Sequence, residues 1–212
     1  MLVNSPVYAS NSYGGVFYNN PSKLKKVALT FDDGPHPRYT KQIIGILKEY
    51  NITATFFVIG VNAQIYPEAL KEISSGGYEI ANHTFSHKSI KKMSVVELQN
   101  EILKCEQTIF ELSGVKTNLF RPPEGACVPE SKGVSEALNY NTILWSIDTL
   151  DWAHTSPDII AETVLSNLKD GDIILMHDYV SKPNTTCDAL KILIPQILKQ
   201  GYEFVTVSEL IK

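Results

Sequence analysis

The residues of this sequence that are best equipped for chemistry each follow a short apolar run. Along the chain they are Asp32 and Asp33, His83 and His87, Arg121, and His177 with Asp178. If the apolar runs are parallel strands, each of these side chains lies at the carboxyl end of its strand, where α/β barrels and open α/β sheets build their active sites. Such a set can hold a metal ion and still leave an acid and a base free.

The Asp32–Asp33 pair lies in the segment Thr-Phe-Asp-Asp-Gly-Pro. Because successive side chains of a strand alternate in direction, one carboxylate can bind a metal while its neighbour faces a reacting water. A plain polar turn is the alternative interpretation, since Asp, Gly and Pro are common in turns. The pair taken alone does not distinguish the two.

His83 and His87 are four residues apart, a spacing that brings both imidazoles to one face if the segment coils after its strand. Two such nitrogens suit zinc, cobalt or nickel, although a chance pair on the surface has the same spacing. Asp33 favours the metal site, because it completes three protein ligands with an open position for water, which is typical of a catalytic site. An ion there would lower the pKa of its bound water toward about 7 and polarise a carbonyl oxygen.

Arg121 opens the segment Arg-Pro-Pro-Glu-Gly, whose two prolines stiffen the loop after a predicted strand. A stiff loop can hold a backbone N–H toward a developing oxyanion. We expect Arg121 to pair with Asp32 and to favour the ionised form of that carboxyl, the alternative being an ordinary structural salt bridge.

The last candidates are His177 and the acids and indoles of residues 145–152. His177 is a candidate general acid that protonates a leaving amine, although a single histidine at a strand end is usually structural. Asp151 is placed to orient and charge-stabilise an imidazole, and Trp152 offers a wall for a sugar ring. Trp145, earlier in the same run, is expected in the core.

Strand-like and helix-like patterns alternate along the chain. The predicted strands cover residues 27–31, 53–59, 78–82, 118–120, 142–147, 172–176 and 202–207. The predicted helices cover residues 39–50, 67–75, 94–112, 130–138, 157–168 and 187–200, the third beginning with a capping box of Ser94 and Glu97. This alternation predicts an α/β fold, and we favour a barrel over an open sheet because the candidate residues come from so many strands.

Length and composition narrow the class of protein. With 212 residues and 43% hydrophobic content, one domain is expected, formed by residues 25–212 behind an N-terminal arm of residues 1–24. The net charge of −4, with scattered lysines, argues against nucleic acid as a partner. No apolar run approaches the roughly 18 residues that cross a bilayer, so no transmembrane segment is expected. Cys105, Cys127 and Cys187 indicate neither a disulfide framework nor a metal-binding pair.

Five segments of the chain together resemble the motifs of one enzyme family. They are Thr-Phe-Asp-Asp-Gly-Pro at 30–35, His-Thr-Phe-Ser-His at 83–87, Phe-Arg-Pro-Pro-Glu-Gly at 120–125, Trp-Ser-Ile-Asp-Thr-Leu-Asp-Trp at 145–152 and Leu-Met-His-Asp at 175–178. In this order they are similar to the motifs of the NodB-homology polysaccharide deacetylases, carbohydrate esterase family 4. The resemblance implies a single-domain distorted (β/α)7 barrel with one divalent metal, usually zinc and sometimes cobalt, that removes acetyl groups from N-acetylated sugars or xylan.

The resemblance also implies a role for each matching residue. Asp32 matches the catalytic base and His177 the general acid, while the metal ligands correspond to Asp33, His83 and His87. Supporting roles fall to Arg121, which positions the base, to Asp151, which tunes the acid, and to Trp152 and Leu175, which receive the acetyl methyl group. One position departs from the pattern, because Glu124 stands where many members have Tyr. The family uses the backbone N–H at that position for the oxyanion, so we expect catalysis to persist with an altered substrate groove.

We therefore expect a metal-dependent hydrolase that removes N-acetyl groups from N-acetylglucosamine polysaccharide, peptidoglycan first and chitin oligomers second, and releases acetate. Zinc is the expected metal, with cobalt or nickel as alternatives. Two other functions stay open: an O-acetyl xylan esterase with the same metal site, and a carbohydrate-binding protein that has lost catalysis and with it a ligand or base.

The expected location is extracellular or associated with the cell wall, because the expected substrate lies outside the membrane. The protein is expected to be a monomer. Residues 1–10 are too short and too polar for a complete signal peptide. Residues 6–10 are either the tail of a removed signal sequence or part of the N-terminal arm.

Overall fold

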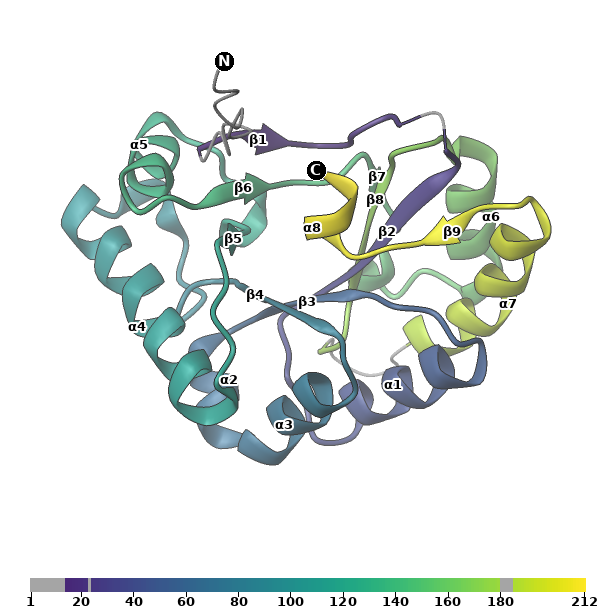
Figure 1. Ribbon diagram of the computed structural model, residues 1–212, viewed down its shortest axis with the longest axis horizontal. Coiled ribbons are helices and arrows are strands. Elements are labelled where there is room, and N and C mark those ends of the chain that lie inside the picture. Colours follow the sequence, from purple (N-terminus) through teal and green to yellow (C-terminus); the bar gives the residue numbers. More distant parts are fainter. Residues whose placement is uncertain (1–13, 23, 180–184) are drawn as a thin grey trace, which may run out of the picture.

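The computed structural model describes residues 14–22, 24–179 and 185–212. One curled sheet of parallel strands forms its centre, with most of the helices around the outside (Figure 1). The strands are β1 Val16–Phe17, β2 Lys26–Asp32, β3 Thr55–Val58, β4 Glu79–Asn82, β5 Leu119–Phe120, β6 Asn141–Ile143, β7 Ile147–Asp148, β8 Ile173–His177 and β9 Glu203–Phe204. Their hydrogen-bonded order is β1-β6-β5-β4-β3-β2-β8-β7, and β9 pairs with β2. The predicted single-domain distorted barrel is confirmed.

Most of the helices lie on the outer face of the sheet, where each packs against its neighbour. The α-helices are α1 Tyr39–Glu49, α2 Gly60–Ile65, α3 Pro67–Ser75, α4 Val95–Ser113, α5 Pro129–Ala137, α6 Pro157–Asn167, α7 Thr186–Lys199 and α8 Val207–Leu210. Single 3-10 turns are η1 Ile90–Lys92, η2 Pro123–Gly125 and η3 Asp151–Ala153. Helix α6 packs on α7, α7 on α1, α1 on α3, α3 on α4 and α4 on α5. The capping box predicted at Ser94 and Glu97 is present at the start of α4.

Side chains of the strands alternate between two hydrophobic clusters. In β2, Leu29 and Phe31 belong to the outer cluster under the helices, whereas Ala28 belongs to the inner cluster inside the curl. By this alternation Asp32 is the last inward side chain of β2. The same argument makes His177 the last inward side chain of β8, where Ile173 is inside. Strand periodicity thus delivers both polar groups to one mouth of the barrel.

The strand predicted at residues 142–147 is wrong, because the structure breaks it in two. Strand β6 pairs with β5, whereas β7 pairs with β8 on the other side of the curl. Between them the N–H of Leu144 donates to the Phe17 carbonyl and the N–H of Ser146 donates to the Ile173 carbonyl. The continuous apolar run concealed this change of partner. The last predicted strand is also too long, since Thr206 caps α8 directly after β9.

The predicted N-terminal arm of residues 1–24 lies partly outside the described residues, which exclude 1–13 and 23 and so the whole segment 6–10. Within the described part, β1 pairs with β6, and the N–H of Asn20 donates to the Gly171 carbonyl at 2.8 Å. This stretch therefore connects β6 with the start of β8. The boundary between residues 24 and 25 stays a prediction.

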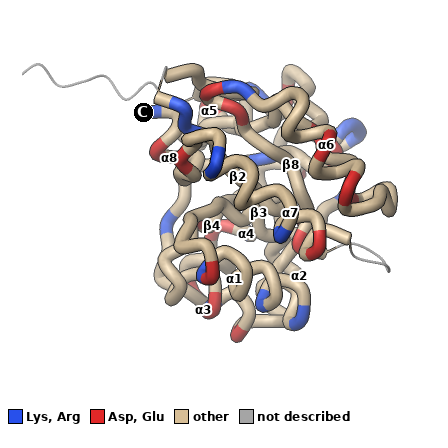
Figure 2. Tube along the Cα trace, turned by 90° about the vertical axis from the view of Figure 1, so that its right-hand side faces the viewer, with Lys and Arg blue, Asp and Glu red and all other residues tan. Residues whose placement is uncertain are grey.

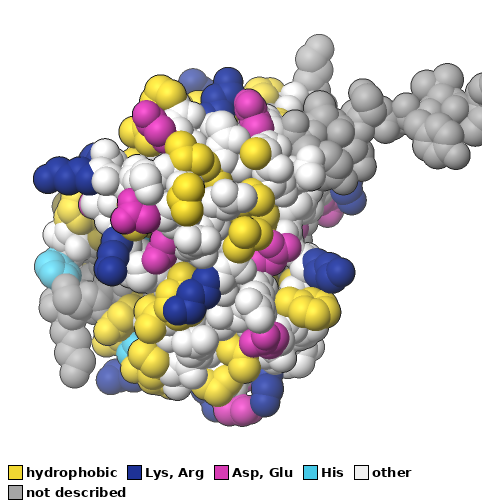
Figure 3. Space-filling view, turned by 90° about the vertical axis from the view of Figure 1, so that its left-hand side faces the viewer, with side chains coloured by type: hydrophobic (Ala, Val, Ile, Leu, Met, Phe, Trp, Pro, Cys, Tyr) yellow, Lys and Arg dark blue, Asp and Glu magenta, His cyan; other side chains and the backbone are white. Residues whose placement is uncertain are grey.

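Two further observations concern the hydrophobicity of the described helices and the charge of the surface. None of the described helices combines the length and the apolar character needed to cross a bilayer. Charged residues of both signs are interspersed on the two side faces of the molecule shown in Figures 2 and 3.

Candidate metal centre and active site

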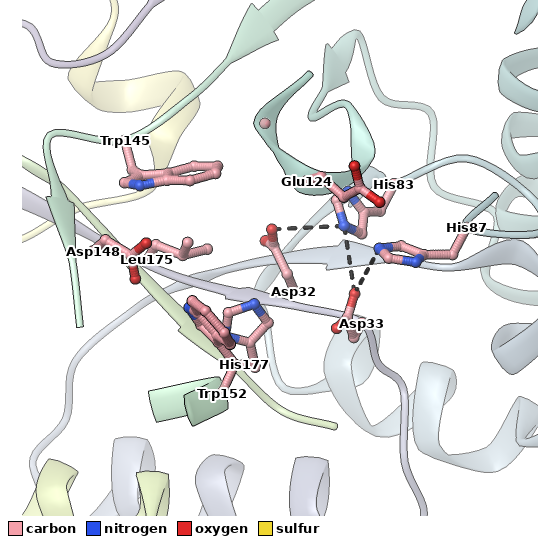
Figure 4. A pocket seen from close by; sticks show the side chains of 11 residues that line it. Asp32, Asp33, His83, His87, Glu124, Trp145, Asp148, Trp152, Leu175 and His177 are labelled. Atoms are coloured by element: carbon pink, nitrogen blue, oxygen red, sulfur yellow. Dashed lines mark ion pairs between the residues drawn. The ribbon is translucent and has the colours of Figure 1, made fainter. Parts of the chain in front are cut away.

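The carboxyl ends of β2, β4, β7 and β8 surround one cavity of about 400 Å³ (Figure 4). Its lining consists of Asp32, Asp33, His83, His87, Glu124, Gly125, Trp145, Asp148, Trp152, Leu175 and His177. Eight of the ten predicted site residues are among them, and the other two, Arg121 and Asp151, are completely buried. The structure therefore brings together residues from five separate segments of the chain.

Three side chains in this cavity face a common point. The Oδ1 atom of Asp33 lies 3.2 Å from Nε2 of His87 and 3.5 Å from Nε2 of His83. One ligand atom from each residue lies within 4.8 Å of the others. The same Oδ1 atom is buried and has no well-formed hydrogen bond among the described residues. A buried carboxylate oxygen left between two imidazole nitrogens fits a divalent metal ion.

The orientation of His83 supports this fit. Its Nδ1 atom lies 2.7 Å from the backbone carbonyl of Arg121. A carbonyl oxygen only accepts, so Nδ1 carries the proton and the lone pair of Nε2 points toward Asp33. Hydrogen bonding of the second ring nitrogen is how proteins fix a metal-binding histidine. The sequence did not show this contact, because the acceptor is a backbone group.

The backbone around these ligands is unusual. Asp33, Thr84 and His87 have φ values of 76°, 66° and 53°, in the left-handed region that costs non-glycine residues about 1–3 kcal/mol each. At Asp33 this conformation returns the carboxylate to the same side as Asp32. Strand alternation, on which the prediction for this pair was based, does not apply, because Asp33 lies beyond the end of β2.

Charges in the cavity favour an ionised Asp33. Burial raises the pKa of the Asp33 carboxyl, but the adjacent imidazoles of His83 and His87 outweigh burial and hold this pKa well below its usual range. Burial lowers the pKa of His87, and the Asp33 carboxylate more than compensates, so the His87 pKa is raised. An ionised Asp33 carboxylate attracts positive charge, as a ligand in a cation site must.

Arg121 holds the carboxylate of Asp32 from inside the barrel. Its Nη1 atom donates to Oδ1 of Asp32 at 2.6 Å and to Oγ1 of Thr30 at 2.9 Å. Its Nε and Nη2 atoms donate to the backbone carbonyls of Ile143 and Leu144 at 3.1 and 3.0 Å. The predicted pairing with Asp32 is present, and the carbonyls at the end of β6 are available because the strand breaks there. Oδ2 of Asp32 is left toward the cavity.

Asp151 holds His177 through two contacts. Its Oδ1 atom lies 2.7 Å from Nδ1 of the imidazole, and its Oδ2 atom accepts from the His177 N–H and from the Thr186 hydroxyl, both at 2.8 Å. Burial lowers the pKa of His177, but the bond to Asp151 and the carboxylates of the cavity raise it to about 9. The imidazole therefore carries a proton at neutral pH, and its Nε2 atom is left for the cavity.

Three residues that line the cavity had no predicted catalytic or binding role, namely Gly125, Trp145 and Asp148. Trp145, expected in the core, packs against the inner cluster and also lines the cavity. A Cβ atom on Gly125 would lie 2.7 Å from its ring, so glycine allows the close approach. Asp148 pairs in register with Leu175, and both side chains therefore face inward. The continuous strand predicted at 142–147 concealed the position of Trp145, and Asp148 follows directly after that strand.

Glu124 lies at the rim of the cavity with its side chain exposed. Its Oε2 atom is 2.9 Å from Nζ of Lys91, and this hydrogen bond lowers the pKa of the Glu124 carboxyl. The backbone of Glu124 is left-handed, with φ of 57°. A negative charge therefore stands beside the cavity, and the oxyanion role of its backbone N–H stays a prediction.

The fold and this arrangement of residues agree with comparisons to known proteins. The pattern of the polysaccharide deacetylase family matches residues 19–143, more than half of the chain. The protein therefore belongs to the polysaccharide deacetylases of the NodB-homology type, the family that its motifs resemble. Its relatives support hydrolysis of the amide bond of an acetylated sugar.

Three relatives show the range of this similarity. A peptidoglycan-N-acetylglucosamine deacetylase of Bacillus cereus is 40% identical over 201 residues, which cover 94% of each chain. The crystal structure of the Bc1960 peptidoglycan N-acetylglucosamine deacetylase has a TM-score of 0.89 and 36% identity, covering 93% of this chain and 92% of that one. BA3943 of Bacillus anthracis, a family pseudoenzyme, also has a TM-score of 0.89, with 28% identity over 98% of this chain and 73% of its own. Because this fold occurs with and without activity, activity has to be argued from the site.

Proposed function

We propose that the protein is a metal-dependent peptidoglycan N-acetylglucosamine deacetylase. The observation that carries the proposal is the convergence of Asp33, His83 and His87 on one point, with Asp32 and His177 close by and each held by its own charged partner. The names of the relatives support the amide of N-acetylglucosamine in peptidoglycan as the bond that is cleaved.

Asp33, His83 and His87 would hold the metal ion. Two imidazole nitrogens and one carboxylate oxygen are a donor set typical of catalytic zinc, and cobalt or nickel are alternatives. When bound, such an ion polarises the acetyl carbonyl and lowers the pKa of a water molecule. The remaining tasks belong to the side chains around it.

Asp32 is the base in the proposed reaction. Arg121 donates to its Oδ1 atom at 2.6 Å, which leaves Oδ2 to accept the proton of the attacking water. The attack produces a tetrahedral oxyanion, which the backbone N–H of Glu124 stabilises. Trp152 and Leu175 receive the methyl group of the acetyl substituent.

His177 is the acid. With a pKa of about 9 it holds its proton at neutral pH and donates it from Nε2 to the departing nitrogen. Acetate and a free amino sugar leave the site. An amide needs this proton more than an ester does, because an amide anion is a far worse leaving group than an alkoxide.

Both alternative functions are less well supported. An O-acetyl xylan esterase would use the same metal site, but two of the relatives described above are named as deacetylases of N-acetylglucosamine in peptidoglycan. A carbohydrate-binding protein without catalysis predicts the loss of a ligand or of the base. All the predicted site residues lie in the described part of the chain, and none is missing.

The proposed substrate also suggests where the protein works. A peptidoglycan deacetylase meets its substrate outside the membrane, so we place the protein outside the cell or at the cell wall, as a monomer.

Acetate release tests the proposal directly. Purified protein is stripped of metal, supplied with zinc or cobalt, and incubated with peptidoglycan, N-acetylated chitooligosaccharide and acetylxylan. We expect acetate from peptidoglycan above the other two, and its loss with a chelator. Release from acetylxylan alone would favour the esterase, and no release from any substrate would favour the binding protein.

A further inference from the structure

Asp178 follows the proposed acid in the chain and has no part in the reaction described above. Its side chain is buried, with 1% of the residue exposed. One oxygen, Oδ2, accepts a hydrogen bond from the Thr40 hydroxyl at the start of α1. The other, Oδ1, has no hydrogen-bond partner among the described residues. A buried carboxylate with only part of its bonding capacity used is unfavourable, so its presence calls for a compensating contact.

The carboxylate packs against Gly34, the residue after the metal ligand Asp33. A Cβ atom on Gly34 would lie 2.1 Å from Oδ2 and 2.3 Å from Oδ1 of Asp178. The carboxylate thus occupies the space that a side chain at position 34 would need. The backbone of Gly34 lowers the pKa of the Asp178 carboxyl, in opposition to burial, which raises it.

The other backbone groups of residues 32–34 are held as well. The carbonyl of Asp32 accepts from the Asp178 N–H at 3.1 Å, and the carbonyl of Gly34 accepts from the Ile59 N–H at 2.9 Å. The Asp33 carbonyl accepts from the Asn62 amide at 2.7 Å. Residue Asp178 therefore touches this turn twice, once through its backbone and once through its carboxylate.

Among the residues that the structure describes, no positive group pairs with the Asp178 carboxylate. Burial, together with the carboxylates of Asp33 and Asp32, raises the pKa of its carboxyl to about 7, against the opposing effects of Thr40 and Gly34. A hydrophobic residue would avoid this repulsion. Unlike a hydrophobic side chain, however, the carboxylate can accept the hydrogen bond of the Thr40 hydroxyl while it packs against Gly34.

From this geometry we propose that Asp178 is a positioning residue for the metal ligand Asp33. Its carboxylate, seated against Gly34 and tied to Thr40, fixes the left-handed turn that returns the Asp33 carboxylate toward His83 and His87. The inference rests on the proposed metal site and extends it to a residue that does not touch the metal.

The test compares zinc affinity with stability in three variants of the whole chain. Asp178→Asn keeps the shape of the side chain and removes its charge, and Thr40→Val removes only the hydroxyl tie. The matched control is Asp172→Asn, at the other end of β8, where a buried carboxylate accepts from Ser146 and Lys169 at 2.8 and 2.6 Å. For each metal-stripped protein, the zinc dissociation constant is measured by competition with a chromophoric chelator, and the unfolding temperature is measured without metal.

We expect Asp178→Asn to weaken zinc binding by about 10- to 100-fold, the range found for residues that support metal ligands, and Thr40→Val to weaken it less. Asp172→Asn should lower the unfolding temperature and leave zinc affinity unchanged. Unchanged zinc affinity in both Asp178→Asn and Thr40→Val, or equal weakening in Asp172→Asn, would overturn the inference while leaving the proposed function intact. A parent protein that binds no zinc would overturn both.

Discussion

The two sides of the cavity are prepared in different ways. On the proton-transfer side, each reacting group is held by a charged partner from the chain. Arg121 donates to Asp32 at 2.6 Å, and Asp151 lies 2.7 Å from the ring of His177. Both supporting residues are completely buried, so these contacts are shielded from water.

On the metal side, the ligand atoms face one another. The Oδ1 atom of Asp33 lies between the ring nitrogens of His83 and His87 without a well-formed hydrogen bond among the described residues. Two of these three residues have left-handed backbones. The proposed acid and base are thus each held by a buried partner from the chain, whereas the three side chains of the metal side are arranged as a cation site would require.

Removal of a metal ligand should have the largest effect on activity. In Asp33→Ala we expect acetate release to fall to background, because two histidines alone do not hold the ion. Zinc should raise the unfolding temperature of the parent and not that of the variant, since only a ligand that binds the folded state stabilises it. If zinc still raises the unfolding temperature of the variant at the zinc concentration that stabilises the parent, the metal binds elsewhere.

Arg121→Ala should have the largest effect on stability. It leaves Asp32 buried without its partner, a change that typically costs about 3–5 kcal/mol. Urea unfolding of the metal-free protein measures this loss, and adding Asp32→Asn to the variant should recover part of it. If the double variant is no more stable than Arg121→Ala, the loss of the hydrogen bonds from Arg121 to the carbonyls of Ile143 and Leu144 accounts for the lower stability instead.

His177→Ala should separate amide from ester chemistry. Loss of a general acid typically lowers the rate by about 10²–10⁴-fold, and we expect this loss on an N-acetyl substrate but a smaller one on an O-acetyl ester with a good leaving group. Steady-state kcat on the two substrates measures the difference. Equal losses would contradict the assignment of His177 as the acid.

Asp151→Asn should change the pH dependence. The pKa of His177 is raised to about 9, above the ordinary 6.5, so the protonated acid and the activity that needs it are lost as pH rises through about 9. Without the Asp151 charge this pKa falls by about 1–3 units, and the basic limb of the rate profile moves to lower pH. The stability that the protonated His177 contributes is complete below pH 6.5 and is lost by about pH 9 in the parent. An unchanged basic limb would show that another group controls it.

Glu124→Gln should have the smallest effect. The carboxylate is exposed and paired with Lys91 at the rim, so kcat/KM on uncharged chitooligosaccharide should stay within about fivefold of the parent. A larger loss would mean that the side chain, and not only its backbone, contacts the substrate.

The sequence predicted those parts of the molecule that depend on local pattern. Alternating strands and helices and residues at strand ends placed Asp32, His83, Arg121 and His177 at one mouth. Contacts made by backbone groups were not predictable, as with the Arg121 carbonyl that orients His83. Nor was the left-handed turn at Asp33, which is stabilised by residues distant in the sequence.

The break between β6 and β7 illustrates the same limit. Residues 142–147 form one apolar run, and only the choice of partner strand divides it. That choice creates the free carbonyls at Ile143 and Leu144 that Arg121 uses. Hydrophobic pattern reports burial, but it does not report which neighbour buries a residue.

Anomalous X-ray scattering at the zinc absorption edge, from a crystal of the zinc-loaded protein, tests the central claim most directly. The account predicts one strong peak about 2.0–2.2 Å from a carboxylate oxygen of Asp33 and from Nε2 of both His83 and His87, with Asp32 and His177 outside the coordination sphere. A peak coordinated by His177 or by other residues would contradict this prediction. The lack of any peak between these three side chains would contradict it as well.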